Sequence, residues 1–207
     1  MGTRATTTTS GTRSVHRLKV TLSGSSPPVW RRLAVPSATT LGQLHHILQR
    51  AMGWEDCHLH EFEAAGSRYG PPGDFLDNGW STPPKDEETA KLSRVAPAGT
   101  RLTYEYDFGD GWHHRIVVEK VEKVAAGGPG ADGPTCLSGR RACPPEDCGG
   151  VWGYEHLLEV LADPAHVEYE ELLEWAGEDF DPERFDLDHV NAGLGRARGA
   201  LAGASWR

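Results

Sequence analysis

The sequence predicts an α+β fold in which helices pack on a mixed, largely antiparallel sheet. Near the N-terminus Leu18, Val20 and Leu22 alternate with polar residues, which is the period of a strand with one buried face. Apolar residues recur at helical spacing between residues 41 and 52. Two β-rich runs then flank Asp110-Gly111, a dipeptide typical of hairpin turns.

The N-terminal part is expected to form a ββα unit. Two apolar runs, HRLKVTL and VWRRLAV, flank the segment SGSSPP, which indicates two strands joined by a turn. Thr40 and Gly53 are typical of residues that begin and end a helix. Between them the apolar positions of one helix face are Leu41, Leu44, Ile47, Leu48 and Met52.

The segment HLHEFEAA, residues 58–65, predicts a third strand, with His58 and His60 on the same face because they alternate with Leu59. Residues 66–99 are rich in Pro, Gly and Asp and are expected to be mostly loop. A loop of this length is either a functional cover or a variable insertion without a role.

The central hairpin is predicted in RLTYEYDFGDGWHHRIVVEKVEK. A two-residue turn at Asp110-Gly111 would place Asp107 directly opposite His114, near enough for a carboxylate to hydrogen-bond an imidazole. Such a pair would serve as an oriented base or a supported metal ligand, or as a structural cross-strand bond. Asp107 could instead bond the backbone N–H of Gly109 or Gly111 within the turn.

The C-terminal portion is expected to be helical. After the linker AAGGPGADGP, one helix should begin near Val151, and residues 167–177 and 181–194 should form two more. Thr-rich residues 1–14 are expected to be a disordered leader, and residues 196–207 a flexible tail. This leaves a single domain from 15 to 195.

Composition restricts the class of partner. The 207 residues include 30 acidic and 21 basic side chains, a net charge of −9 that repels phosphate backbones, so no nucleic-acid binding is expected. No apolar run approaches the length of about 20 residues that a membrane span needs. The protein is therefore expected to be cytoplasmic, with a protein or a small molecule as its ligand.

The cysteines suggest a metal site. Cys136, Cys143 and Cys148 fall within one short stretch, and a Gly/Pro-rich loop could bring three thiolates to one zinc ion. His114, His58 or His60 would complete a Cys₃His set. The alternatives are plain thiols without metal, or a reactive Cys148 thiolate at a helix N-terminus with a histidine as base.

Several motifs together resemble one protein family, the plasmid pRiA4b ORF-3-like proteins, some of which are associated with mobile elements. The motifs are VWRRL, AMGW with HLHEF, YDFGDGWHHRI, CPPEDCGG with GYEHLLE, and FDPERFDLDHVN. The resemblance runs from about Val15 to Leu194. It implies a mixed sheet packed by helices, and it implies no assigned activity.

Two classes of function remain open. The first is a zinc-stabilised binding or accessory module. The second is a small hydrolase-type or lyase-type enzyme that depends on a metal or on a Cys/His pair, with Asp107, His114 and Glu146 as catalytic residues. Glu146 and the neighbouring Asp147 could instead cap the following helix. Four closed protein ligands would indicate the module, and three ligands with an open position would indicate catalysis.

Overall fold

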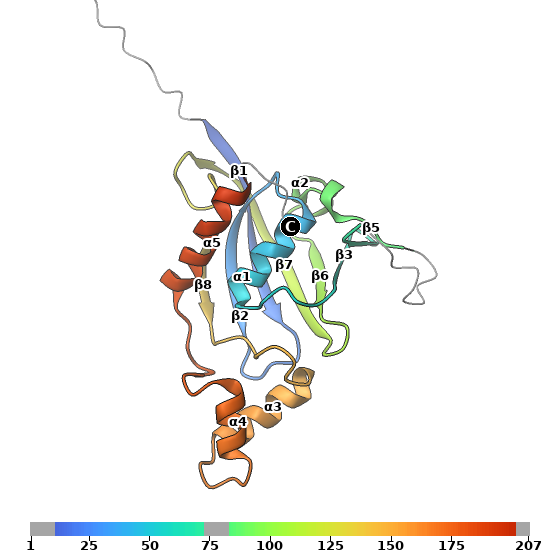
Figure 1. The fold of residues 1–207 in the computed structure, drawn as a ribbon. Coiled ribbons are helices and arrows are strands. Elements are labelled where there is room, and N and C mark those ends of the chain that lie inside the picture. Colours follow the sequence, from blue (N-terminus) through green and yellow to red (C-terminus); the bar gives the residue numbers. More distant parts are fainter. Residues whose placement is uncertain (1–10, 73–82, 202–207) are drawn as a thin grey trace, which may run out of the picture.

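The computed structural model describes residues 11–72 and 83–201, the last six of these by their backbone alone. Eight strands form one sheet in the order β5-β4-β3-β6-β7-β1-β2-β8, in which every pair is antiparallel except β4 with β5 (Figure 1). The predicted α+β fold is therefore confirmed. The strands are β1 (Thr12–Leu22), β2 (Trp30–Pro36), β3 (His60–Ala64), β4 (Ser67–Gly70), β5 (Lys85–Asp86), β6 (Arg101–Tyr106), β7 (Trp112–Ala125) and β8 (Thr135–Arg140).

The N-terminal ββα unit forms as predicted. Strands β1 and β2 pair antiparallel with Leu18 opposite Leu33, and helix α1 (Leu41–Met52) follows. Thr40 accepts a hydrogen bond from the Gln43 N–H at 3.1 Å, and the Gln43 side chain accepts one from the Thr40 N–H, which is a capping box. Gly53 ends the helix with φ 105°, a left-handed conformation that favours glycine.

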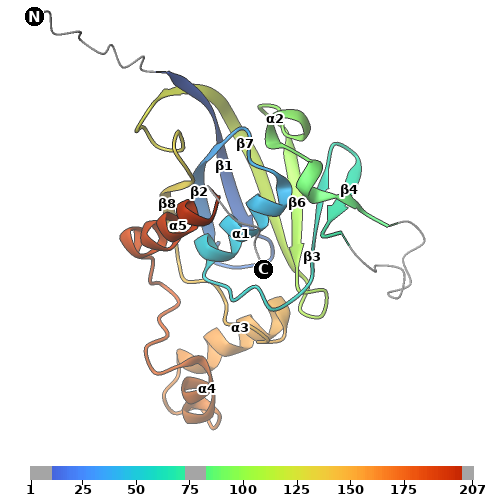
Figure 2. The same cartoon turned by 45° about the horizontal axis from the view of Figure 1, so that its top comes forward.

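One face of the sheet is buried beneath α1 and α5 (Leu187–Leu201), as Figures 1 and 2 show. β1, β6 and β7 each bury alternate side chains, so the core lies between this face and α1. On the opposite face Arg32 and Glu119 form an ion pair with two hydrogen bonds, at 2.8 and 2.9 Å. The sheet thus has a buried face and a solvated one.

Helices α3 (Gly150–Leu161) and α4 (Tyr169–Ala176) project from one end of the sheet as a separate lobe (Figure 1). Helix α4 has no buried residue. The third helix near the C-terminus is expected from the sequence over residues 181–194, but it begins only at Leu187. Residues 181–186 connect α4 with α5. Among the described residues no helix is both long and apolar enough to cross a membrane.

The ends of the domain differ in detail from the sequence prediction. Strand β1 begins at Thr12, and Arg13 and Ser14 pair with the long strand β7, so residues 12–14 belong to the sheet and not to the expected leader. Residues 1–10 and 202–207 lie outside the described residues. The expected loop at 66–99 contains β4, β5, a 3₁₀ turn (Glu87–Thr89) and the short helix α2 (Leu92–Val95), and its residues 73–82 are not described.

The central hairpin has a longer loop than predicted. Tyr104 lies opposite His114 and Tyr106 opposite Trp112, so the β6–β7 loop comprises residues 107–111. The predicted two-residue turn is wrong, and so is the pairing of Asp107 with His114. Asp107 has φ 55°, its side chain accepts a bond from the Gly109 N–H at 2.9 Å, and its carbonyl accepts one from Gly111 at 2.7 Å. Asp107 therefore closes the turn itself, which confirms the alternative interpretation.

We predict that Gly150→Ala lowers the free energy of unfolding by about 1–3 kcal/mol, because Gly150 has φ +68° and a Cβ there would lie 2.4 Å from the carbonyl oxygen of Asp110. Urea denaturation measures the change. The control is Gly193→Ala in α5, where no atom lies within 4 Å of the added Cβ and alanine should be neutral or stabilising by up to about 1 kcal/mol. Equal effects at the two positions would contradict the role assigned to Gly150.

Candidate functional site

Three loops meet at the end of the sheet nearest α3. They are the loop after α1, the β6–β7 loop and the segment before α3. The Asp107 N–H donates to the Leu59 carbonyl at 2.9 Å, and the Gly149 N–H donates to the Asp110 carboxylate at 3.1 Å. Because backbone groups make these bonds, the three loops hold defined positions relative to one another.

His58 lies at the centre of this junction, among three carboxylates. Its Nε2 is 3.1 Å from Asp147 Oδ1, 3.7 Å from Asp107 Oδ2 and 3.9 Å from Glu146 Oε2. The ligand atoms of His58, Asp107 and Asp147 all lie within 4.8 Å of one another, and those of Cys57, His58 and Glu146 form a second such group. The junction therefore has the residue types and spacing of a metal site.

Two polar atoms of this cluster are buried without a hydrogen-bond partner among the described residues, His58 Nε2 and Glu146 Oε2. The short distance from His58 to Asp147 lacks hydrogen-bond alignment. The other oxygen of Glu146 accepts bonds from the Tyr106 hydroxyl at 3.0 Å and the Glu55 N–H at 2.9 Å. Burial raises the pKa of Tyr106 above its usual value, so the hydroxyl keeps its proton and donates it.

The backbone is strained at this junction. Asp56, Asp107 and Asp147 have φ of 60°, 55° and 54°, and they are three of the five described non-glycine residues with positive φ. Aspartate tolerates this left-handed region better than most residues, but the conformation still costs free energy and is often found at functional sites. The concentration of such residues here supports a functional role.

A buried network anchors the loop that carries His58. Asp56 accepts hydrogen bonds from His45 at 2.6 Å and from His46 at 3.0 Å, and His45 also bonds the Tyr104 hydroxyl at 2.8 Å. Burial lowers the pKa of His45 to about 4. Although these ligand atoms also lie within 4.8 Å of one another, each has a hydrogen-bond partner, so a structural role explains this group.

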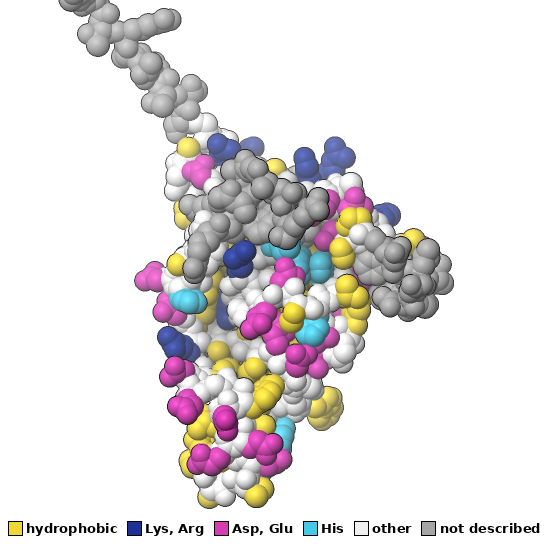
Figure 3. All heavy atoms as spheres, in the orientation of Figure 1, with side chains coloured by type: hydrophobic (Ala, Val, Ile, Leu, Met, Phe, Trp, Pro, Cys, Tyr) yellow, Lys and Arg dark blue, Asp and Glu magenta, His cyan; other side chains and the backbone are white. Residues whose placement is uncertain are grey.

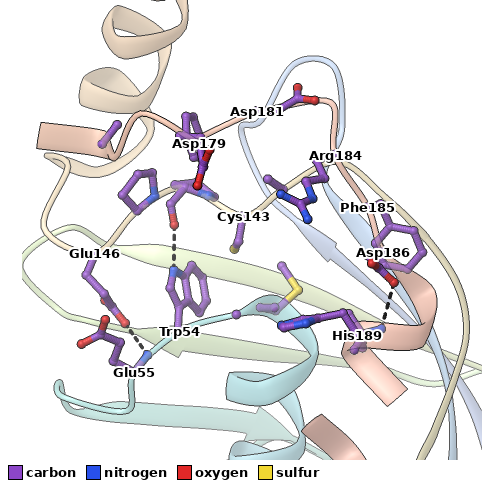
Figure 4. Close-up of a pocket in the computed structure, with 18 of the residues that line it drawn as sticks. Trp54, Glu55, Cys143, Glu146, Asp179, Asp181, Arg184, Phe185, Asp186 and His189 are labelled. Carbon is purple, nitrogen blue, oxygen red and sulfur yellow. Dashed lines mark hydrogen bonds between the residues drawn. The ribbon is translucent and has the colours of Figure 1, made fainter. Parts of the chain in front are cut away.

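A cavity of about 510 Å³ adjoins the junction (Figure 4). Trp54 and Glu146 form one side of it. Arg184, from the segment between α4 and α5, and His189, in the first turn of α5, lie on the other. The Trp54 indole N–H donates to the Pro144 carbonyl at 3.1 Å, which fixes the indole in the wall. Glu146 therefore belongs both to the cavity and to the cluster around His58.

The sequence profile of the plasmid pRiA4b ORF-3-like proteins matches residues 14–189. The chain belongs to this family. It is 42% identical over 181 residues to the uncharacterized protein y4hQ of Sinorhizobium fredii. The aligned region covers 86% of this chain and 89% of y4hQ. The crystal structure of MM3350 from Methanosarcina mazei, a protein of unknown function, superposes with a TM-score of 0.74 at 41% identity and covers 85% of this chain and 97% of the other.

Among the described residues of this pRiA4b ORF-3-like protein, no three of the predicted ligand atoms lie within 4.8 Å of one another, although Cys143 and Cys148 are close enough to interact electrostatically. Cys136 lies on β8 rather than in a loop, opposite Leu33, and Cys143 lines the 510 Å³ cavity. Cys148 follows Asp147 just before α3. None of these thiols, nor His114, belongs to any of the three described groups of metal-type ligands.

The thiols are also poor nucleophiles. Burial raises the pKa of Cys136 and of Cys143, and raises that of Cys148 to about 12. This is opposite to the low pKa that a reactive Cys148 at a helix N-terminus would need. Glu146 does not cap α3, whose N-cap residue is Gly149 without a side-chain bond.

His114 lies in the core rather than at the junction. It is fully buried, its Nδ1 is 3.3 Å from the Tyr104 carbonyl, and its ring meets Trp54 edge-on at 5.0 Å. His60 is likewise buried, with Nε2 3.0 Å from Glu87 and its ring stacked on His45. Neither imidazole lies in a group of metal-type ligands with His58.

The sequence prediction includes His58 as one candidate for the histidine of a Cys₃His set, but it assigns no ligand role to Asp147. Strand β3 begins at His60, so His58 belongs to the preceding loop. The alternation of side chains along a strand therefore does not determine the direction of the His58 side chain. Both residues lie in motifs that the sequence analysis singled out, HLHEF and CPPEDCGG. Their meeting depends on hydrogen bonds between loops that no local pattern predicts.

We predict that His114 makes stability depend on pH. Burial lowers its pKa from 6.5 to about 4, so the unfolded chain binds the proton first and stability falls as the pH drops from about 6.5 towards 4. Between pH 7 and pH 5 the loss from this group is on the order of 2 kcal/mol. Urea denaturation should show that the free energy of unfolding falls less between pH 7 and pH 5 in His114→Gln than in the parent protein.

The control for this measurement is His113→Gln, on the solvent-exposed face of the same strand. It should leave the difference between pH 7 and pH 5 as large as in the parent protein. If the two variants behave alike, His114 is not the group responsible.

Proposed function

We propose that this protein binds one divalent transition-metal ion, with zinc as the first candidate, through His58, Asp107 and Asp147. An imidazole with two carboxylates is a ligand set that suits zinc and its first-row neighbours. Ligands that share one zinc ion at about 2.0–2.1 Å lie roughly 3–3.5 Å from one another. The distance of 3.1 Å from His58 Nε2 to Asp147 falls within this range, and the distance of 3.7 Å to Asp107 lies just above it.

The observation that carries the proposal is the pair of buried atoms without a partner, His58 Nε2 and Glu146 Oε2, which lie 3.9 Å apart. Leaving a buried polar atom unsatisfied costs about 1–3 kcal/mol. A bound cation would take the imidazole lone pair as a ligand and would attract the carboxylate. One ion therefore accounts for both atoms.

The carboxylates are oriented for this role by bonds to their other oxygens. Asp107 Oδ1 accepts the Gly109 N–H, which leaves Oδ2 directed at His58. Glu146 Oε1 accepts the Tyr106 hydroxyl and the Glu55 N–H, which leaves Oε2 free. Such supporting bonds hold the ligand atoms in place before the metal arrives.

The arrangement favours an enzyme over a purely structural ion. The Asp147 side chain is 70% exposed and the adjoining cavity reaches Glu146, so water or a substrate has access to the metal. Three protein ligands with an open position are typical of catalytic zinc. Glu146 is placed to act as general base, and the metal would activate a water molecule, as in hydrolases and lyases.

A zinc-stabilised module is the second candidate, and one observation supports it. His58, Asp107 and Asp147 come from three loops far apart in the sequence. An ion bound by all three would cross-link them and raise stability. The two candidates share the metal site and differ in whether a coordination position stays open.

We predict that the purified protein takes up about one equivalent of zinc, and that His58→Ala weakens the affinity by more than the roughly 10- to 100-fold typical of losing a supporting residue. Asp107→Asn should weaken it as well. Competition with a chromophoric chelator measures the affinity. Cys136→Ser and His113→Ala are the controls, because neither residue belongs to the cluster. Full zinc affinity in His58→Ala would refute the site.

We further predict that the ion keeps at least one exchangeable water molecule. Loading the protein with Mn²⁺ and measuring the relaxation of water protons reports such a ligand directly. Strong enhancement, retained in Glu146→Gln, supports the enzyme, since Glu146 is then a base rather than a ligand. Tight Mn²⁺ binding without enhancement indicates a closed site and favours the module.

A further inference from the structure

Acidic residues are concentrated in the helical lobe. Thirteen of the 30 aspartates and glutamates lie between Arg141 and Arg184, a stretch without any lysine or arginine. All 21 basic residues lie in the rest of the chain with the other 17 acidic ones, so the two parts have net charges of −13 and +4. Figure 3 shows magenta and yellow side chains over the lobe of α3 and α4, and dark blue ones mainly above it.

The same lobe exposes large apolar side chains. Trp175 is 48% exposed, and Trp152 and Val167 are 84% and 93% exposed. These residues lie on or beside α3 and α4, and α4 itself buries no residue. Exposed tryptophan is common at binding surfaces and unusual elsewhere on a monomer.

A groove of about 670 Å³ runs between α3 and α4. Leu157 of α3 and Leu172 and Trp175 of α4 supply its apolar surface, and Glu171 and Glu174 supply carboxylates along α4. Both glutamates are exposed, and no described ion pair involves either of them. The groove thus combines apolar contact area with two carboxylates that make no described ion pair, and the histidine in its lining, His156, lies 3.3 Å from Glu168 instead.

We propose that this groove binds a basic amphipathic segment, most simply a helix, of a partner protein. Its apolar side chains would cover Leu172 and Trp175, and its lysines or arginines would pair with Glu171 and Glu174. Laying the apolar face of a helix into a groove is a recurrent mode of peptide recognition, and complementary charge sets both partner choice and association rate. The proposal does not depend on the metal site.

The charge of the lobe distinguishes a basic peptide from two other kinds of partner, a nucleic acid and a second copy of this chain. A nucleic acid would be repelled by the acidic lobe. A second copy of this chain is a different case, because the remainder of the chain has a net charge of +4, opposite in sign to that of the lobe. Self-association is therefore measured alongside peptide binding.

The full-length protein is titrated into three fluorescent synthetic peptides, with anisotropy as the readout. One is an amphipathic helix of lysine and leucine, one has glutamate in place of lysine, and one has serine in place of leucine. We expect binding to the lysine–leucine peptide alone, weakening as salt is raised because charge pairing is screened. Absence of binding, or equal binding of the lysine–serine peptide, overturns the proposal.

Variants then test the groove itself. Trp175→Ala and Glu174→Lys should each weaken binding about tenfold or more. Glu174 lies in the last turn of α4, where lysine complements the helix dipole, so this variant should remain folded. The matched controls are Trp152→Ala and Glu155→Lys, which alter the same residue types on α3 outside the groove and should leave the affinity within about twofold.

Equal weakening by Glu155→Lys and Glu174→Lys would mean that diffuse charge rather than the groove attracts the peptide, and would overturn the proposal. Sedimentation of the unliganded protein tests whether the groove binds a second copy of the chain. A monomer is expected. A dimer that Trp175→Ala dissociates would assign the groove to a second copy of the chain and would likewise overturn it.

Discussion

The site depends on the way Asp107 closes the β6–β7 loop. Its left-handed backbone, with its carboxylate bonded to Gly109, ends strand pairing at Tyr106 and turns the chain within five residues. The N–H of the same residue bonds Leu59, and so attaches the loop after α1. One residue thus shapes the turn, joins two loops and offers its second carboxylate oxygen to His58.

The third loop is attached to this turn by close backbone contact. The Asp110 carboxylate accepts the Gly149 N–H, and the Asp110 carbonyl lies where a side chain at Gly150 would be. Because Gly150 begins α3, this contact also sets where the helical lobe leaves the sheet. The positions of the acidic groove and of the His58 cluster therefore have a common structural origin.

The candidate metal ligands differ in burial between the core, where Cys136 and His114 lie, and the loop junction around His58. Cys136 and His114 lie within the core, where desolvation keeps the thiol protonated and the imidazole neutral. The carboxylates around His58 differ in exposure, because Asp107 is buried whereas the Asp147 side chain is 70% exposed. The donors grouped at metal-ligand spacing around His58 are carboxylates and the thiol of exposed Cys57, and not the three cysteines of the predicted zinc set.

The sequence by itself determined the parts of this protein that follow from local pattern. The period of β1, the ends of α1 at Thr40 and Gly53, and the presence of a hairpin between β6 and β7 all depend on residues close together in the chain, and each is predicted from the sequence. The tertiary structure alone decided the turn length and the cluster around His58. A turn is set by whichever backbone conformation satisfies its hydrogen bonds. Because Asp107 accepts the Gly109 N–H, the chain turns over residues 107–111 and not at Asp110-Gly111 alone. His58, Asp107 and Asp147 meet because bonds between distant loops hold them together, and no spacing along the chain records such bonds.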